Sequence, residues 1–205
     1  MAEHIQDARF GPPEGGQSIV CEEPHDDVVE HIEGFVSGLG GTKESDRALA
    51  AILYTDIVGS TERVSAMGDR EWRNLLDTHD AVARTIVEQH RGKIVKTTGD
   101  GILAIFDGPG RAIRCALALR NALQPLGLEI RAGLHTGEVE MRGTDIAGIA
   151  AHIAARVLEA TPPGGLLVSG AVPMLVAGSG FEFEDRGEYE LKGVPGAWKL
   201  FAVEN

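Results

Sequence analysis

The 205-residue sequence contains few cysteines, few aromatic residues and no long hydrophobic run. Its two cysteines, Cys21 and Cys115, form no C-x-x-C spacing, so neither a zinc site nor a disulfide scaffold is supported. The longest apolar stretches contain about seven residues, whereas a helix that crosses a bilayer needs roughly twenty. The start of the chain also lacks the basic residues and the apolar centre of a signal peptide. The sequence therefore predicts a cytoplasmic location.

Basic residues are scarce as well. The chain has 19 Lys and Arg against 31 Asp and Glu, which gives a formal net charge of −12. Proteins that bind nucleic acid or an anionic membrane through phosphate electrostatics need the opposite balance. We therefore expect no nucleic-acid partner and no membrane partner.

Acidic residues are concentrated at the start of the chain, where residues 1–47 contain eleven acidic and three basic side chains. We expect residues 1–25 to form a disordered acidic tail, because they are rich in Gly, Pro and acids without periodicity. Residues 26–47 predict a short amphipathic helix and a glycine-rich linker. Such a helix fits a docking role against the core, or a regulatory or dimer-contacting role. Residues 48–205 are expected to form one catalytic domain.

Strand and helix patterns alternate from residue 48 onward. The order β, α, β, β, α, β is typical of a ferredoxin-like α+β fold, an antiparallel sheet with helices on one side, here followed by C-terminal β/α additions. The expected elements are a strand over 50–55, a helix from Ser60 to His90, strands over 93–97 and 102–106, a helix over 110–122, a strand over 128–135, a turn at Thr136–Gly137, a short strand to Met141, a helix over 146–160, a strand over 166–169, a short helix over 171–176 and a closing hairpin over 181–191 and 199–203.

Two aspartates occupy unusual places in this pattern. Asp56 lies where an apolar strand ends, and Asp100 lies between Gly99 and Gly101 in a tight turn. Each alone also fits a turn-forming role. Together, beside glycines that allow close approach, they are suited to a hard divalent cation. The sequence has no phosphate-binding P-loop, no G-x-S-x-G, no H-E-x-x-H and no G-x-G-x-x-G motif, so ordinary hydrolase and P-loop functions are not supported.

Four separated motifs resemble the catalytic domain of class III nucleotide cyclases, and the resemblance covers roughly residues 48–204. The motifs are Leu53–Thr61, Lys96–Gly101, Arg131–Glu138 and Asp145–Arg156. The resemblance implies that Asp56, Asp100 and the backbone carbonyl of Ile57 hold two Mg²⁺ or Mn²⁺ ions. One ion would activate the ribose 3′-hydroxyl and the other would neutralise the departing pyrophosphate. Asp56, solvent or substrate phosphate would accept the proton.

The resemblance also implies that Lys96 and Asp145 recognise the purine. An ammonium group donates to ring N1 of adenine and a carboxylate accepts from the exocyclic amine, whereas guanine inverts both requirements. The pair therefore favours ATP over GTP. Without the resemblance, Lys96 is a solvated strand lysine, and Asp145 also fits the N-cap of the following helix.

The remaining site residues are implied by position in the same motifs. Arg156 matches the arginine that stabilises charge on the α-phosphate, although a structural arginine in a buried pair is the alternative. His152 stands where the family commonly has an asparagine that orients the ribose, which is the clearest departure from the family pattern. Arg131 and, from a loop, Lys192 match phosphate contacts.

The resemblance implies a shared active site, because the family takes metal ligands from one domain and purine-binding residues from another. This chain has one such domain, so a head-to-tail homodimer would form two equivalent sites. The sequence thus predicts an adenylate cyclase that converts ATP to 3′,5′-cyclic AMP and pyrophosphate. The alternatives are a catalytically silent nucleotide-binding or regulatory module of the same fold, and a guanylate or dual-specificity cyclase.

Overall fold

A computed structural model of the protein describes residues 47–204. The predicted acidic tail over 1–25 lies outside the described residues. The predicted helix and linker over 26–47 also lie outside the described residues, except for Arg47, which begins the first strand.

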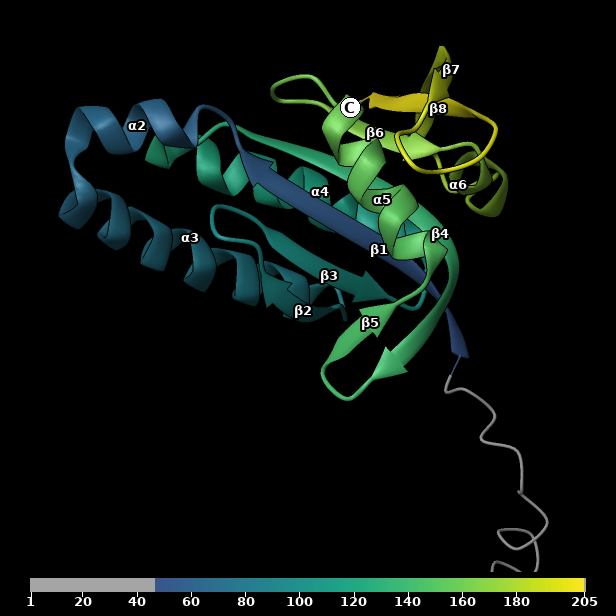
Figure 1. Ribbon diagram of the computed structural model, residues 1–205, viewed down its shortest axis with the longest axis horizontal. Helices are drawn as coiled ribbons and strands as arrows, with labels where there is room; N and C mark the ends of the chain where they lie inside the picture. The colour runs from purple at the N-terminus through teal and green to yellow at the C-terminus, as the bar shows by residue number, and fades with distance from the viewer. Residues whose placement is uncertain (1–46, 205) are drawn as a thin grey trace, which may run out of the picture. The chain divides into compact units, whose positions relative to one another are not determined.

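The described residues form a mixture of strands and helices (Figure 1). In chain order they are β1 (Arg47–Ile57), α2 (Ser60–Met67), α3 (Asp69–Gln89), β2 (Lys93–Thr97), β3 (Ile102–Phe106), α4 (Pro109–Leu123), the 3₁₀ turn η1 (Gln124–Leu126), β4 (Ile130–Arg142), β5 (Asp145–Ala147), α5 (Ile149–Ala160), β6 (Leu166–Ser169), α6 (Ala171–Leu175), β7 (Glu182–Glu190) and β8 (Ala197–Glu204).

The strands form one sheet in the order β2-β3-β1-β4-β6-β8-β7, with β5 paired to β4 beside this path. Only the β4–β6 pair is parallel among the described pairs, and the others are antiparallel. The first four strands with α3 and α4 reproduce the predicted βαββαβ core, and β6, β8 and β7 extend it. The predicted ferredoxin-like α+β fold is confirmed.

The two faces of β1 contact different helices, because successive side chains of a strand point to opposite faces. Ala51 and Leu53 pack in a core cluster with residues of α3 and α4. Ala50 and Ile52 pack in a second cluster with residues of α5. The helices of the βαββαβ core therefore share one face, and α5 from the C-terminal additions lies on the other, in front of the sheet in Figure 1.

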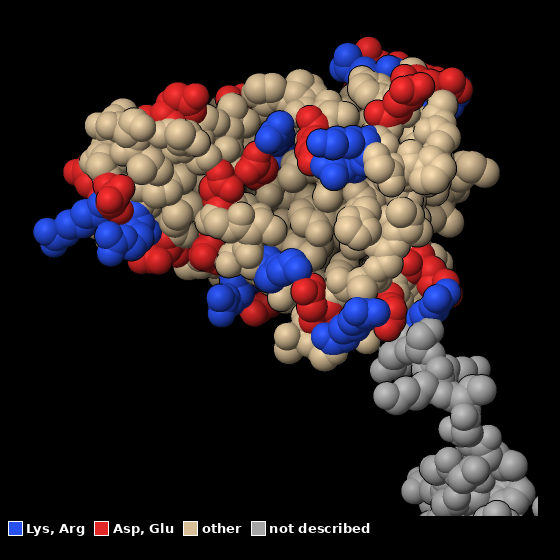
Figure 2. All heavy atoms as spheres, viewed as in Figure 1, with Lys and Arg blue, Asp and Glu red and all other residues tan. Residues whose placement is uncertain are grey.

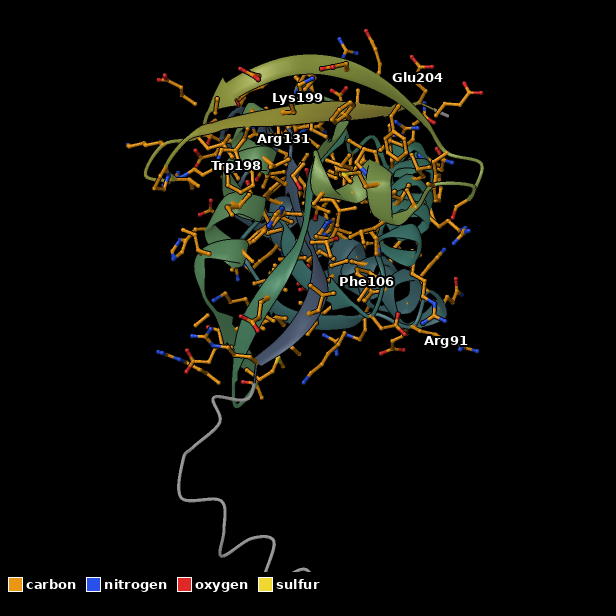
Figure 3. The ribbon with its side chains drawn as sticks, turned by 90° about the vertical axis from the view of Figure 1, so that its right-hand side faces the viewer. Arg91, Phe106, Arg131, Trp198, Lys199 and Glu204 are labelled. Carbon is orange, nitrogen blue, oxygen red and sulfur yellow. The ribbon has the colours of Figure 1, made fainter. Side chains whose placement is uncertain are left out.

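Helix α3 ends at a close contact with the sheet. Arg91 has a positive φ of 56°, and a Cβ atom on the next residue, Gly92, would lie 2.3 Å from the Phe106 ring. Figure 3 shows Arg91 at the edge of the molecule and Phe106 further inside. The predicted stop at Gly92 thus has a packing cause, since only glycine lets the chain pass this ring.

Three predicted boundaries are wrong. The helix expected from Ser60 to His90 is two helices, because Gly68 adopts φ 85° and ψ 160° between α2 and α3. The turn expected at Thr136–Gly137 is absent, since β4 runs continuously through both residues. The helix expected from 146 begins at Ile149 after the short strand β5. Its N-cap is Gly148, so the N-cap alternative for Asp145 is wrong.

Candidate active site

Asp56 and Asp100 lie together because the β2–β3 turn is fastened to the end of β1. The Ile57 N–H donates to the Asp100 carbonyl at 3.1 Å, and the Ile102 N–H donates to the buried Thr55 hydroxyl at 3.2 Å. A Cβ atom at Gly101 would lie 1.9 Å from the Thr55 carbonyl oxygen. The turn therefore depends on glycine to bring the Asp100 backbone against β1.

The surroundings of the Asp56 carboxylate shift its pKa in opposite directions. Partial burial raises its pKa above the ordinary value, and the nearby Asp100 charge raises it further. The hydrogen bond from Arg131 acts the other way, but the net shift of the pKa is upward. Two carboxylates held this close repel each other when both are ionised, and a cation between them would relieve that repulsion.

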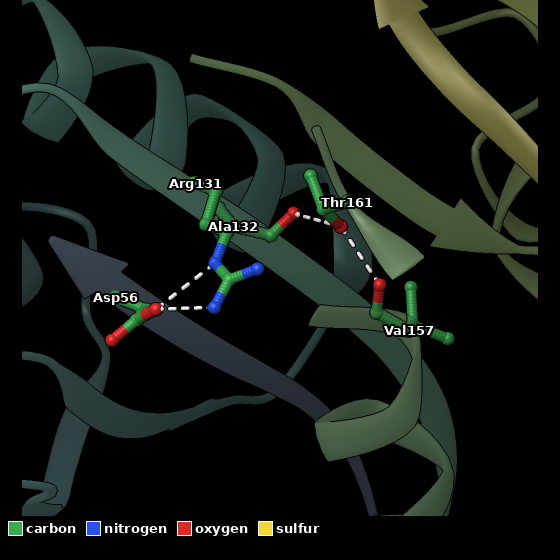
Figure 4. Close-up of polar contacts among 5 residues, drawn as sticks. All are labelled: Asp56, Arg131, Ala132, Val157 and Thr161. Atoms are coloured by element: carbon green, nitrogen blue, oxygen red, sulfur yellow. Dashed lines mark hydrogen bonds and ion pairs between the residues drawn. The ribbon is translucent and has the colours of Figure 1, made fainter. Parts of the chain in front are cut away.

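Arg131 lies directly opposite Asp56 in the antiparallel β1–β4 pair. Its Nε and Nη2 groups both donate to Asp56 Oδ2, at 2.9 and 2.6 Å (Figure 4). On β4 the neighbouring Ala132 carbonyl accepts from the Thr161 hydroxyl, which also donates to the Val157 carbonyl. This part of β4 is thereby tied to the end of α5.

A surface pocket of about 270 Å³ opens at the Asp56 side of this arrangement. Its walls combine the end of β1, the start of α2 and the Arg131 side chain, and its lining residues are Asp56, Ile57, Val58, Gly59, Ser60, Thr61, Glu62, Arg131 and Pro163. The first backbone N–H groups of α2 lie at this pocket, and such groups favour anions. The pocket therefore combines the Asp56 carboxylate, which is suited to a cation, with backbone groups suited to phosphate, and the Glu62 carboxylate also lines it.

Lys96 and Asp145 form a second pair. Lys96 on β2 donates from Nζ to both carboxylate oxygens of Asp145 on β5, at 2.8 and 3.0 Å. The hydrogen bond from Lys96 lowers the pKa of Asp145, and a backbone N–H bond from Ile146 contributes. The same pair raises the pKa of Lys96. Both groups therefore stay charged at neutral pH.

Arg156 is held from two sides. Its Nε donates to the Lys192 carbonyl at 3.0 Å, and its Nη1 forms an ion pair with Glu159 one turn further along α5. The exposed His152 precedes Arg156 by four residues, which places both on one side of α5. Lys192 lies in the β7–β8 loop, so its backbone supports the position of Arg156 while its side chain is exposed.

The contacts thus place the predicted residues in three sets. Asp56, Ile57, Asp100 and Arg131 meet at the end of β1, Lys96 meets Asp145, and Arg156 meets the backbone of Lys192. Sequence reasoning missed Glu159 as the partner of Arg156, although the Arg–Glu spacing of three on a helix would have indicated it. It also missed Tyr54, whose pKa is raised by burial and whose charge state is influenced by Lys96 and Asp145.

Two properties of the described residues bear on ligands. Across residues 47–204, no group of three or more His, Cys, Asp and Glu side chains is arranged to hold a metal ion. The pair Asp56 and Asp100 would therefore need the Ile57 carbonyl and non-protein ligands to complete a coordination shell. Within the same residues, none of the helices has the length and hydropathy to cross a membrane. On the face shown in Figure 2, acidic and basic side chains are interspersed.

Comparison with known proteins identifies the class of domain. The family described as the adenylate and guanylate cyclase catalytic domain matches residues 43–205. The chain therefore belongs to the adenylate and guanylate cyclase catalytic-domain family. It is 30% identical over 158 residues to a putative adenylate cyclase 3 of Rhizobium meliloti, an alignment that covers 72% of this chain and 27% of that protein. The chain thus spans about a quarter of the length of this relative.

Solved structures agree with this fold. The adenylyl cyclase CyaB from P. aeruginosa has a TM-score of 0.72 and 22% identity, covering 78% of this chain and 95% of the other. An adenylate/guanylate cyclase/hydrolase from Silicibacter pomeroyi has a TM-score of 0.69 and 29% identity, covering 77% and 96%. The similarity supports a nucleotide cyclase domain. Which purine nucleotide the domain uses is inferred below from the site residues.

Proposed function

We propose that the chain is an adenylate cyclase that converts ATP to 3′,5′-cyclic AMP and pyrophosphate. The observation that carries the proposal is the convergence of Asp56 and Asp100 at the end of β1, beside Arg131 and the start of α2. Hard oxygen ligands next to anion-binding groups suit a triphosphate with its divalent cations. The similarity to a putative adenylate cyclase of Rhizobium meliloti supports the same reaction.

In the proposed reaction the ribose 3′-oxygen attacks the α-phosphorus and the bond from that phosphorus to the α–β bridging oxygen breaks. Pyrophosphate leaves with that oxygen, and the proton of the 3′-hydroxyl passes to Asp56, solvent or substrate phosphate. Two Mg²⁺ or Mn²⁺ ions held by Asp56, Asp100 and the Ile57 carbonyl would activate the hydroxyl and neutralise the phosphates. Arg131 would bind the phosphates, and Arg156 would stabilise the charge that develops on the α-phosphate.

The Lys96–Asp145 pair supports ATP as the substrate. Lys96 offers a donor for ring N1, and Asp145 offers an acceptor for the exocyclic amine. His152 would contact the ribose from α5, and the Lys192 side chain would reach the phosphates from the β7–β8 loop. Each of these roles follows from the match of the residue to a family position.

We further propose that two copies of the chain assemble head to tail. One copy would supply Asp56, Ile57, Asp100 and Arg131, and the other would supply Lys96, Asp145, His152, Arg156 and Lys192. One chain carries every one of these residues once, so a symmetric pair would contain two equivalent sites.

The test is to incubate the full chain with ATP or GTP and with Mg²⁺ or Mn²⁺, and to measure cyclic AMP, cyclic GMP and pyrophosphate. We expect cyclic AMP with ATP, and no product from Asp100→Asn. Cyclic GMP as the main product would reject the assignment of Lys96 and Asp145 but keep the cyclase. Nucleotide binding by a dimer without either product would replace the enzyme by a binding module.

A further inference from the structure

The contact between Arg131 and Asp56 bears on how a cation can enter the site. Two donor nitrogens of Arg131, Nε and Nη2, are directed at the single oxygen Oδ2 of Asp56. The pair is largely shielded, with 33% of the Arg131 side chain and 23% of the Asp56 side chain exposed. A charge-assisted contact of this kind is short and strong compared with neutral hydrogen bonds.

The backbone fixes this contact. Arg131 and Asp56 are direct partners in the β1–β4 register, so their side chains leave neighbouring strands at the same level. The flanking positions of both strands, Thr55 opposite Ala132 and Ile57 opposite Ile130, are buried. The strands therefore present the guanidinium to the carboxylate before any ligand is present.

Arg131 and a divalent cation compete for the same carboxylate. The guanidinium occupies Oδ2, and its positive charge repels a second cation at that position. The Arg131 side chain also lines the pocket that faces the start of α2. A triphosphate in this pocket would give the guanidinium an alternative anion, for which its planar array of donors is well suited.

We propose that Arg131 is the counter-ion of Asp56 in the nucleotide-free protein and must turn to the triphosphate before Asp56 can bind a divalent cation tightly. Cation and nucleotide then bind cooperatively, and each increases the affinity for the other by the same factor. This inference rests on the proposed function for the nature of its two ligands. It gives Arg131 a second role in that function. In the absence of nucleotide, Arg131 prevents a cation from binding tightly to the site.

The first test is titration of the full chain with Mn²⁺ alone, in which electron paramagnetic resonance measures the concentration of free Mn²⁺. We expect Arg131→Gln to bind Mn²⁺ at least about fivefold more tightly than the natural chain, because the competing charge is gone. Arg84→Gln, which removes one exposed charge from α3, is the matched control and should leave Mn²⁺ affinity unchanged. Asp56→Asn combined with Arg131→Gln should abolish the gain.

The second test measures the coupling with 3′-deoxy-ATP, which has no 3′-hydroxyl and cannot cyclise. We expect Mn²⁺ to strengthen binding of 3′-deoxy-ATP to the natural chain by a larger factor than to Arg131→Gln, measured by calorimetry. Arg131→Lys keeps the charge without the two parallel donors, so its Mn²⁺ affinity should lie between the other two. Circular dichroism of each variant confirms that it is folded.

Mn²⁺ affinity of Arg131→Gln that is equal to or weaker than that of the natural chain overturns the inference. The same conclusion follows when neither protein binds Mn²⁺ alone. Neither titration depends on turnover, so the inference and the proposed function can fail separately. If Arg131→Gln binds Mn²⁺ more tightly but the natural chain makes no cyclic AMP, the proposed function alone is rejected. If the natural chain makes cyclic AMP but Arg131→Gln has unchanged Mn²⁺ affinity, the inference alone is rejected.

Discussion

Lys96 on β2 and Asp145 on β5 are 49 positions apart in the sequence, yet the Lys96 Nζ lies 2.8 and 3.0 Å from the two carboxylate oxygens of Asp145. About half of each side chain is exposed. The pair is therefore accessible to a ligand, and each partner keeps the other charged and in place. This arrangement gives the proposed purine specificity a definite test.

We predict that Lys96→Glu combined with Asp145→Ser shifts the preferred substrate from ATP to GTP. The glutamate would accept from guanine N1–H, and the serine would donate to the guanine carbonyl. Since a mismatched hydrogen-bonding group leaves a polar atom unpaired, cyclic AMP synthesis should fall by about 10²-fold or more. The measurement is kcat/KM for both nucleotides. Lys96→Gln alone should reduce the rate with ATP without creating activity with GTP, and an unchanged preference in the double variant would contradict the assignment.

The shared site predicts complementation between inactive variants. Asp56→Asn and Arg156→Gln should each be inactive, because each one damages both sites of a homodimer. After mixing and reassociation, a mixed dimer has one site with both residues intact, so an equal mixture should recover about a quarter of the natural activity. A mixture that stays inactive although mixed dimers are demonstrated by mass spectrometry would exclude the shared site.

Gly101 should be more sensitive to substitution than Gly99, two residues earlier in the same turn. An alanine Cβ at Gly101 would lie 1.9 Å from the Thr55 carbonyl oxygen and 3.0 Å from the Asp56 Cα, so backbone must move. We expect Gly101→Ala to cost more than about 2 kcal/mol in unfolding free energy and to abolish activity, because Asp100 moves away from Asp56.

Gly99→Ala is the matched control for this prediction. Gly99 has φ of 96°, but beyond its two chain neighbours no atom of the described residues lies within 4 Å of the place an alanine Cβ would take, so only backbone strain opposes the substitution. That strain should cost about 1–2 kcal/mol. Urea denaturation and Mn²⁺-dependent activity would compare the two variants, and equal effects would show that the close approach at Gly101 does not position the site.

The regular elements can be predicted from the sequence because their apolar periodicity is strong. Glycine is the source of the errors, since its local signal does not distinguish a turn from a close contact. The local pattern predicts a turn at Gly137, but this residue lies within β4, where a Cβ would be 2.8 Å from the Ala150 Cβ and 2.9 Å from the His135 Nε2. Gly68 instead breaks a helix that the apolar pattern continues through.

The candidate site shows the same division between local and long-range information. Motifs predict the residues themselves, but their contacts depend on strand register. Arg131 meets Asp56 only because the two residues are partners in the β1–β4 pair. The local alternative for Asp145 is a helix cap, whereas its place on β5 brings it to Lys96. Register depends on the whole sheet, so no local pattern specifies it.

The last prediction concerns His135, which is 5% exposed on β4 and shares a 2.6 Å hydrogen bond with the Ser169 hydroxyl. Its ring also meets the Trp198 ring edge-on at 5.8 Å between centroids. Burial lowers the pKa of His135 from 6.5 to about 4. The folded protein therefore keeps this imidazole neutral at pH values where the unfolded chain protonates it.

The sign of the resulting pH dependence follows from that difference. Between pH 6.5 and 4 the unfolded state binds a proton that the folded state does not, so stability falls as the pH is lowered through this window. The loss attributable to His135 should reach about 3 kcal/mol. We expect urea denaturation of the natural chain at pH 7, 5.5 and 4.5 to show a steeper decline than His135→Gln. Parallel curves for the natural chain and His135→Gln would contradict the prediction.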